Sequence, residues 1–390
     1  MLNFEFCSPT KFVFGRDTQQ RVGSLVREFG GTRALIVYGG GSVVRSGLLD
    51  QVKASLDAAG VYHMELGGVK PNPRSDLVYE GIRICRENQL DFLLPIGGGS
   101  AIDTAKAIAD GVPYDGDFWD LYTRKAEVKT ALPHGCVLTI PAAGSEGSNS
   151  SVITKIEGNL KRGLSTEFHR PRFAVMNPEL TFTLPRYQLG CGVTDMMAHI
   201  MERYFTNTKD VDLTDRLAEA LLVSIREAAP RAMADTTDYE AHATLMWAGM
   251  LAHNNSVGVG REQDWASHQI GHEISAKYDT AHGASLAIVF PAWMQYVYKH
   301  DVKRFVQFAT RVWGVDPAGK TDEEIAIAGI HAMQAFFLSL GMPATLEQGG
   351  GKAEDIPALA ANVVNGRSGN FVKLFPPQIE EILHIASEAK

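Results

Sequence analysis

Short apolar runs alternate with amphipathic stretches through the first half of the chain. The apolar runs, each of a length that suits a strand, lie at 33–42, 61–66, 91–100, 136–141 and 172–178. Helical patterns cover 43–59 and 75–89 between them. Continuous apolar runs flanked by helices are typical of buried parallel strands. The pattern predicts a doubly wound α/β sheet, with two extra strands near 4–6 and 12–14 and a hairpin over 150–168.

The strand pattern stops near residue 185, where helical periodicity takes over. The helical segments lie at 186–206, 210–228, 238–255, 261–277, 282–299, 300–312, 321–340 and 376–388. We therefore expect two domains, an α/β domain over 1–185 and an all-helical domain over 186–390.

Composition narrows the class of protein. The 390 residues carry 37 basic against 45 acidic side chains, a net charge of −8, which argues against nucleic acid as a partner. The four cysteines are far apart and form no C-x-x-C pair, which disfavours a thiolate zinc site or a redox dithiol. No signal-peptide pattern and no apolar run near the ~20 residues of a membrane helix is present. We expect a reduced cytoplasmic setting and no membrane partner.

Two loops, 39–42 and 97–100, both read Gly-Gly-Gly-Ser and follow an apolar run. Glycine lets the backbone approach a ligand closely, and a helix N-terminus after it attracts phosphate. In the second loop we expect Ser100 to be a helix N-cap, with Asp103 completing a capping box. Neither loop matches G-x-G-x-x-G or a Walker motif, so a strand–turn–helix junction without a ligand remains the alternative reading.

The first loop also bears on cofactor choice. Enzymes that prefer NAD commonly place a carboxylate near the adenosine ribose. After Tyr38 no acidic residue appears before Asp50, which leaves room for a 2′-phosphate that Ser42 and backbone amides could bind. This favours NADP(H), although the loop need not meet the ribose at all.

Histidine and aspartate form a pattern in the helical half. Two pairs have i, i+4 spacing and a further histidine follows them: Asp195 with His199, His268 with His272, and then His282. On a helix each pair shares one face. Imidazole with carboxylate suits a divalent transition metal, zinc or ferrous iron. Spacing alone does not exclude His242 and His253 as ligands.

Taken together, these motifs resemble the iron-containing (group III) alcohol dehydrogenase family, in its branch of butanol dehydrogenases and NADPH-dependent aldehyde reductases. The likeness covers nearly the whole chain. It rests on YGGGS (38–42), PNP (71–73), GGGSAIDTAK (97–106), T-x-P-A-x-G-S-E (139–146), D-x-x-x-H (195–199), H-x-x-x-H (268–272) and AHG (281–283). It implies a dehydroquinate synthase-like fold: an N-terminal dinucleotide-binding domain, a helical catalytic domain, and an active site in the cleft between them.

The resemblance also implies roles for individual residues. The metal ligands would be Asp195, His199, His268 and His282. His272, near the substrate, would relay protons, so that His268 and His272 are the catalytic residues. The pyrophosphate would lie on Gly98, Gly99, Ser100 and Asp103. Further cofactor contacts would be Gly39, Gly40, Gly41, Ser42, Asn72, Thr139, Ser145 and Lys161. Gly40 is an aspartate in NAD-preferring relatives, so glycine points to NADP(H), and Lys161 could help hold the added phosphate.

The function implied is hydride transfer between NADP(H) and a small primary alcohol or aldehyde in a homodimer, with a divalent metal as Lewis acid. Fe²⁺ or Zn²⁺ is expected, and Mn²⁺ and Ni²⁺ remain open because ligand type narrows the choice without deciding it. The alternatives are a metal- and NAD-dependent lyase or a metallohydrolase of related fold. A non-catalytic binding protein is a third reading.

Overall fold

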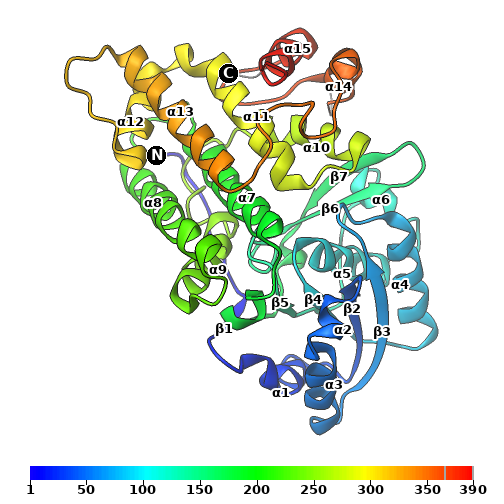
Figure 1. Ribbon diagram of the computed structural model, residues 1–390. Helices are drawn as coiled ribbons and strands as arrows, with labels where there is room; N and C mark the ends of the chain where they lie inside the picture. The colour runs from blue at the N-terminus through cyan, green and yellow to red at the C-terminus, as the bar shows by residue number, and fades with distance from the viewer. Residues whose placement is uncertain (364–365, 389–390) are drawn as a thin grey trace. The chain divides into compact units, whose positions relative to one another are not determined.

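The chain folds into two compact units in a computed structural model that describes residues 1–363 and 366–388. The α/β unit consists of Cys7–Thr183, and the helical unit of Met1–Phe6 with Leu184–Lys390. Figure 1 labels most of the helices and strands of both. Each unit has its own hydrophobic core, so the two are described in turn.

A six-stranded parallel sheet forms the centre of the α/β unit. In spatial order its strands are β1 (Lys11–Phe14), β8 (Phe173–Met176), β5 (Cys136–Leu138), β4 (Phe92–Gly97), β2 (Arg33–Gly39) and β3 (Tyr62–Val69). This confirms the predicted α/β fold. The strand expected at 4–6 is wrong, because residues 1–10 have no regular structure and Phe4 and Phe6 are exposed.

Helices cover both faces of this sheet. Successive side chains of β2 point to opposite faces, and both sets are buried under helices. Ala34 and Ile36 pack in the same core as α1 (Val22–Glu28) and α3 (Leu48–Ala58). Leu35 and Val37, on the opposite face, share a core with α4 (Ser75–Glu87) and α5 (Gly99–Gly111). Because both faces are buried, the strand reads as a continuous apolar run rather than an alternating one. Two short helices, α2 (Ser42–Arg45) and α6 (Trp119–Tyr122), complete this unit's α-helices.

A β-hairpin extends from the α/β unit, as expected over 150–168. Its strands, β6 (Ser150–Lys155) and β7 (Leu160–Ser165), pair antiparallel with Thr154 opposite Lys161. The amide of Thr154 donates to the carbonyl of Pro73 at 2.8 Å. The hairpin is thereby attached to the PNP segment that follows β3.

The helical unit places its helices around a single large core, to which buried side chains of α7 and α11 contribute heavily. Its α-helices are α7 (Arg186–Tyr204), α8 (Asp212–Ala234), α9 (Tyr239–His253), α10 (Ala266–Tyr278), α11 (His282–Val297), α12 (Val302–Trp313), α13 (Asp322–Ser339), α14 (Ile356–Asn362) and α15 (Pro376–Ile385). The eight segments predicted from periodicity correspond to α7–α13 and α15, whereas α14 was not predicted.

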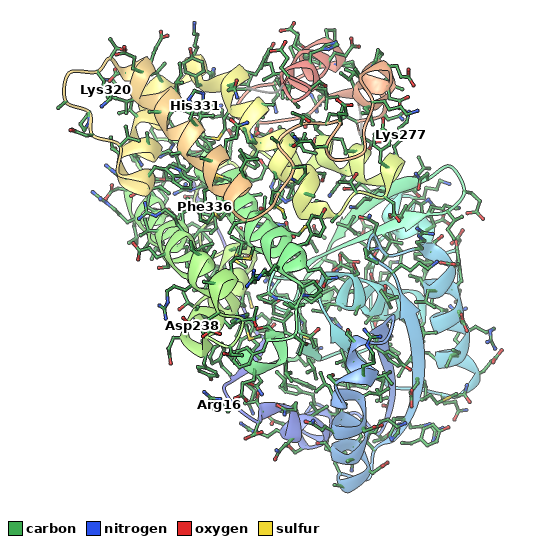
Figure 2. The ribbon with its side chains drawn as sticks, in the orientation of Figure 1. Arg16, Asp238, Lys277, Lys320, His331 and Phe336 are labelled. Carbon is green, nitrogen blue, oxygen red and sulfur yellow. The ribbon has the colours of Figure 1, made fainter. Side chains whose placement is uncertain are left out.

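Local sequence signals set several helix starts in this unit. Asp238, labelled in Figure 2, caps α9 by accepting from the amide of Ala241. Thr321 and Glu324 form a capping box at the start of α13, because each side chain accepts from the other's backbone amide. Within the described residues, no helix combines the length and apolar character that crossing a membrane would require.

Candidate metal centre and cofactor site

Three of the expected metal ligands converge in the helical unit. Asp195 lies on α7, His268 on α10 and His282 at the start of α11. One potential ligand atom from each lies within 4.8 Å of the other two. The Nε2 atoms of His268 and His282 are 3.8 and 3.7 Å from Oδ1 of Asp195. Ligands bonded at about 2.0–2.2 Å to a tetrahedral ion are roughly 3.3–3.6 Å apart, so the three groups are close to that spacing.

His199 lies next to these three groups, one turn after Asp195 on α7. Its Nδ1 is 2.9 Å from the backbone carbonyl of Asp195 and 3.1 Å from the carboxylate Oδ1. The imidazole packs against His268, with ring centroids 4.5 Å apart, and against His253 at 4.0 Å. With Nδ1 donating to the carbonyl, Nε2 keeps the lone pair that a ligand needs.

Two atoms of the group lack a hydrogen-bond partner among the described residues. They are Oδ1 of Asp195 and Nε2 of His268, and both are buried. An unsatisfied buried polar atom costs about 1–3 kcal/mol, and native structures keep few of them. A cation shared between a carboxylate oxygen and imidazole nitrogens satisfies both atoms, so the donor set fits a divalent metal.

The pKa of the Asp195 carboxyl also fits a metal-binding role. Burial alone raises the pKa of this carboxyl, but the neighbouring imidazoles of His199 and His282 outweigh that effect. The net result is a pKa well below the ordinary value. The side chain is therefore an anion, as a metal-binding carboxylate must be.

His272 lies one turn after His268 on α10 and beside His282. Its ring centroid is 5.2 Å from that of His282 and 6.4 Å from that of His268. The side chain is half-buried. It is therefore near the donor set and partly open to solvent, although it is not one of the three converging groups.

Sequence reasoning missed Glu202, which contacts the imidazole of His268. Nδ1 of His268 donates to Oε1 of Glu202 at 2.9 Å, and both side chains are buried. The spacing carried a signal, because Glu202 is seven residues, or two helical turns, after Asp195 and shares its face of α7.

The second glycine loop connects β4 to α5, and its N-cap differs from the expected one. The N-cap residue is Gly98, in an extended conformation, while Ser100 lies inside the helix. Asp103 makes no capping box. Its carboxylate instead accepts from Oγ of Ser145 at 2.6 Å and from the amide of Val152 at 2.9 Å. The expectation for Ser100 was wrong because the helix begins after Gly98, a residue without a side chain that lies two positions before Ser100.

Close packing explains the glycines in this loop. A Cβ on Gly98 would lie 2.9 Å from Cβ of Ile140, and one on Gly99 would lie 3.4 Å from Cβ of Ala143. The amide of Thr139, which follows β5, donates to the carbonyl of Gly97 at 3.0 Å. The loop and the 139–146 stretch are thus packed together, and the start of α5 is left with free backbone amides that can bind a phosphate.

Lys106, also missed by sequence reasoning, fixes the segment after β5. Its buried Nζ donates to the carbonyl and Oγ of Ser145, at 2.7 and 2.9 Å, and to the carbonyl of Ser150 at 2.9 Å. Burial lowers the pKa of this lysine to about 8, against the opposing effect of Asp103. The signal in the sequence was that Lys106 is the one basic residue of α5, a helix whose residues are mostly buried.

Two more of the expected cofactor contacts lie together. Nζ of Lys161, on β7, donates to Oδ1 of Asn72 at 2.9 Å, and both side chains are buried. Asn72 has φ +53°, in the left-handed region that asparagine tolerates better than most residues. The left-handed conformation of Asn72 therefore allows its side-chain amide oxygen to face Lys161 of the hairpin.

The first glycine loop joins β2 to the short helix α2. No heavy atom lies within 4 Å of a Cβ built on Gly40, and its φ is not positive. Gly41 has φ +125°, and a Cβ there would be 2.9 Å from Nη1 of Arg45. Ser42 is the first residue of α2. The loop therefore has open space at Gly40 and an exposed guanidinium beside Gly41.

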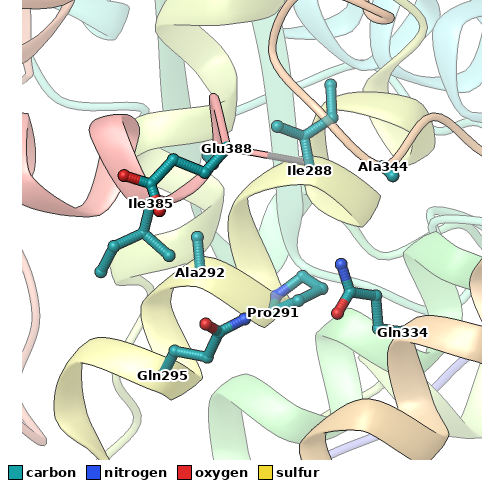
Figure 3. Close-up of a pocket in the computed structure, with 9 residues that line it drawn as sticks. Ile288, Pro291, Ala292, Gln295, Gln334, Ala344, Ile385 and Glu388 are labelled. Atoms are coloured by element: carbon teal, nitrogen blue, oxygen red, sulfur yellow. The ribbon is translucent and has the colours of Figure 1, made fainter. Parts of the chain in front are cut away.

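Figure 3 shows a separate hollow in the helical unit. Its lining is mainly aliphatic, with the amides of Gln295 and Gln334 and the carboxylate of Glu388. None of the described lining residues belongs to the Asp195, His268 and His282 group. The candidate chemistry therefore does not involve this hollow.

Both halves of the chain match models of one protein family. Residues 9–178 match "Iron-containing alcohol dehydrogenase", and residues 191–387 match "Fe-containing alcohol dehydrogenase family, C-terminal". These matches, on an α/β unit followed by a helical unit, agree with the resemblance drawn from the motifs.

Individual relatives agree with the family models. The chain is 43% identical over 384 residues to probable NADH-dependent butanol dehydrogenase 1 of Bacillus subtilis, covering 98% of this chain and 99% of that protein. It is 39% identical over 365 residues to the NADPH-dependent aldehyde reductase YqhD of Escherichia coli, covering 92% of each. The crystal structure of NADH-dependent butanol dehydrogenase A from Thermotoga maritima superposes with a TM-score of 0.96 at 37% identity, covering 100% of this chain and 99% of that one. The chain therefore belongs to the iron-containing alcohol dehydrogenase family and is an alcohol oxidoreductase.

Proposed function

We propose that the protein is a metal-dependent alcohol dehydrogenase that interconverts small primary alcohols and aldehydes and prefers NADP(H). The observation that supports this most strongly is the convergence of Asp195, His268 and His282 within 4.8 Å. Within the described part of the chain, buried Oδ1 of Asp195 and Nε2 of His268 make no hydrogen bond. The names of the relatives, two butanol dehydrogenases and an aldehyde reductase, support the substrate class.

Four side chains of the helical unit would hold the ion: Asp195, His199, His268 and His282. When bound, a divalent ion supplies Lewis acidity that lowers the pKa of an alcohol hydroxyl and polarises an aldehyde carbonyl, while nicotinamide supplies or accepts hydride. Three neutral imidazoles and one carboxylate contribute a single negative charge. The site would thus keep a net positive charge with any divalent ion, which favours the deprotonated form of an alcohol.

His272 would move the proton. Alcohol oxidation releases a proton from the hydroxyl, and aldehyde reduction takes one up. An imidazole has a pKa suited to both directions near neutral pH. His272 is half-buried and packs 5.2 Å, centroid to centroid, from His282. It can therefore exchange a proton between a substrate held near His282 and solvent.

The α/β unit would bind the cofactor. The start of α5, at Gly98, Gly99 and Ser100, offers backbone amides to the pyrophosphate. Asp103 and Ser145, which bond to each other at 2.6 Å, would hold that loop and the segment with Thr139 in place. Lys161, bonded to Asn72, would place a cation beside the cofactor phosphates.

The preference for NADP(H) rests on the first glycine loop, from Gly39 to Ser42. The names of the relatives do not agree on the cofactor. The butanol dehydrogenases are named as NADH-dependent, and YqhD is named as NADPH-dependent. In this chain the space at Gly40 is open, and the guanidinium of Arg45 lies beside Gly41. Open space with a nearby cation suits a 2′-phosphate, whereas NAD-specific loops place a carboxylate against the ribose hydroxyls.

The alternative of a metal-dependent lyase or hydrolase is not favoured, because both family models that match the chain are those of alcohol dehydrogenases. The homodimer, the cytoplasmic setting, and the choice of Fe²⁺ over Zn²⁺, Mn²⁺ or Ni²⁺ stay predictions. Light scattering on the purified protein checks the homodimer.

The proposed function is tested by following NADPH absorbance with butanal as substrate. Metal-stripped enzyme is compared with enzyme restored by Fe²⁺ or Zn²⁺ under anaerobic conditions. We expect no NADPH oxidation without metal, and turnover after restoration that is faster with NADPH than with NADH. Full activity in the stripped enzyme would refute the role of the metal.

A further inference from the structure

One buried carboxylate, Glu202 on α7, accepts three hydrogen bonds from the start of α10. Its Oε1 accepts from Nδ1 and from the backbone amide of His268, both at 2.9 Å. Its Oε2 accepts from the amide of Trp265 at 2.8 Å. The side chain of Glu202 is fully buried, so none of these donors is exchanged for water.

These contacts make Glu202 the cap of α10. The N-cap residue, Trp265, has φ +69° and its side chain makes no capping bond. Amides in the first turn of a helix need acceptors from elsewhere, and an anion there is stabilised by the helix dipole. Glu202 accepts from the N-cap amide and from that of His268, the third residue of the helix, and thereby fixes the position of His268.

The same carboxylate also selects the tautomer of His268. Because Nδ1 donates its proton to Glu202, Nε2 carries the lone pair. That Nε2 is buried, has no hydrogen-bond partner among residues 1–363 and 366–388, and lies 3.8 Å from Oδ1 of Asp195. A carboxylate on the far nitrogen of a ligating histidine sets the ring orientation and raises its basicity.

We propose that Glu202 is a positioning residue of the metal centre, which holds His268 in the orientation and tautomer that present Nε2 to the ion. This inference rests on the proposed metal role. Oε1 is already shared by two N–H donors of His268 and Oε2 is bonded to Trp265, so Glu202 acts through His268 and is not itself a ligand.

Glutamine is the informative substitution, because it is nearly isosteric yet has only one acceptor atom. If its oxygen faces His268, its amide NH₂ meets the N–H of Trp265, and two donors oppose each other. If its oxygen faces Trp265, the NH₂ meets Nδ1 of His268 and favours the wrong tautomer. Either way the preference for a free lone pair on Nε2 is weakened.

The experiment measures metal affinity of stripped protein by titration with Co²⁺, whose visible absorption reports its ligand set, and with Zn²⁺ against a competing chelator. Glu219→Gln is the matched control, since Glu219 is a buried carboxylate of the same unit that accepts from Tyr204 and Arg311. Among the described residues, it makes no hydrogen bond or ion pair with the four proposed ligands. We expect Glu202→Gln to weaken binding roughly 10–100-fold and alter the Co²⁺ spectrum, while Glu219→Gln matches the wild type.

The outcomes separate the two proposals. If the wild type fails to bind one equivalent of metal, the proposed function is lost. If the wild type binds and Glu202→Gln binds equally well, with an identical Co²⁺ spectrum, the role of Glu202 is refuted. Should Glu202→Gln not fold, the metal-free wild type, in which no ion occupies Nε2, decides by imidazole ¹⁵N chemical shifts. A proton on Nδ1 of His268 supports the proposal, and a proton on Nε2 overturns it.

Discussion

Nζ of Lys161 donates to Oδ1 of Asn72 at 2.9 Å, although the two residues are 89 positions apart in the chain. The hairpin that carries Lys161 is attached to the segment after Asn72 by the 2.8 Å bond from the amide of Thr154 to the carbonyl of Pro73. A buried ammonium is therefore held in one place by a side-chain amide and by backbone pairing, as recognition of a phosphate requires.

Lys161→Ala is expected to weaken NADPH binding. A hydrogen bond to a charged group contributes about 1.5–3 kcal/mol, which corresponds to a rise in the Kd for NADPH of roughly 10–100-fold. Fluorescence titration of the bound dinucleotide measures it. Lys129→Ala, which removes an exposed lysine of the same unit, is the control, and an equal Kd in both variants would exclude Lys161 from the cofactor site.

Gly40→Asp is expected to shift the cofactor preference from NADPH towards NADH. A Cβ at this position meets no heavy atom within 4 Å and the φ of Gly40 is not positive, so the effect should come from charge rather than from misfolding. A carboxylate repels a 2′-phosphate and accepts from a ribose hydroxyl. We expect the ratio of kcat/KM for NADPH over NADH to fall at least about tenfold, or about 1.4 kcal/mol.

Arg45→Gln gives an independent check of the same loop. Removing the guanidinium beside Gly41 should raise KM for NADPH and leave KM for NADH unchanged. Parallel changes with both cofactors, or none, would show that this loop does not meet the ribose phosphate.

Glu146 is expected to make stability depend on pH. Burial raises the pKa of this carboxyl to about 7, from an ordinary value of 4.5. A raised pKa means that the folded state binds the proton more tightly than the unfolded state does. The stability that this carboxyl contributes is therefore fully present below pH 4.5 and is lost as the pH rises through 7. The loss is on the order of 3 kcal/mol.

Chemical denaturation of Glu146→Gln against the wild type measures this contribution. The difference in free energy of unfolding should move in favour of the variant between pH 4.5 and 7 and change little above that range. A difference that is constant over this range would show that Glu146 is not protonated in the folded protein.

The sequence predicted most of the fold because its signals are local. The apolar run at β2 and the periodicity of α7 each reflect burial of the element itself. The prediction of a strand at 4–6 was wrong. Phe4 and Phe6 flank a polar residue, as apolar positions do in a half-buried strand, but both phenylalanines are exposed. Helix α14 was not predicted because seven residues give too little periodicity to detect.

The candidate site was predicted less completely, because its geometry depends on pairs of helices. The i, i+4 rule placed Asp195 near His199 and His268 near His272, but it could not show that His282, from a third helix, converges with Asp195 and His268. Glu202 and Lys106 were missed for the same reason. Their roles are defined by donors and acceptors that lie 39 to 66 positions away.

The metal content of His282→Ala tests the central claim most directly. The wild type, His282→Ala and the control His331→Ala, which changes an exposed histidine of α13 labelled in Figure 2, are loaded with Fe²⁺ and desalted. Bound metal is then counted by mass spectrometry, and NADPH-dependent aldehyde reduction is assayed. The account predicts one metal per chain and turnover in the wild type and His331→Ala, with both lost in a folded His282→Ala. Equal metal content and equal rate in all three proteins would contradict it.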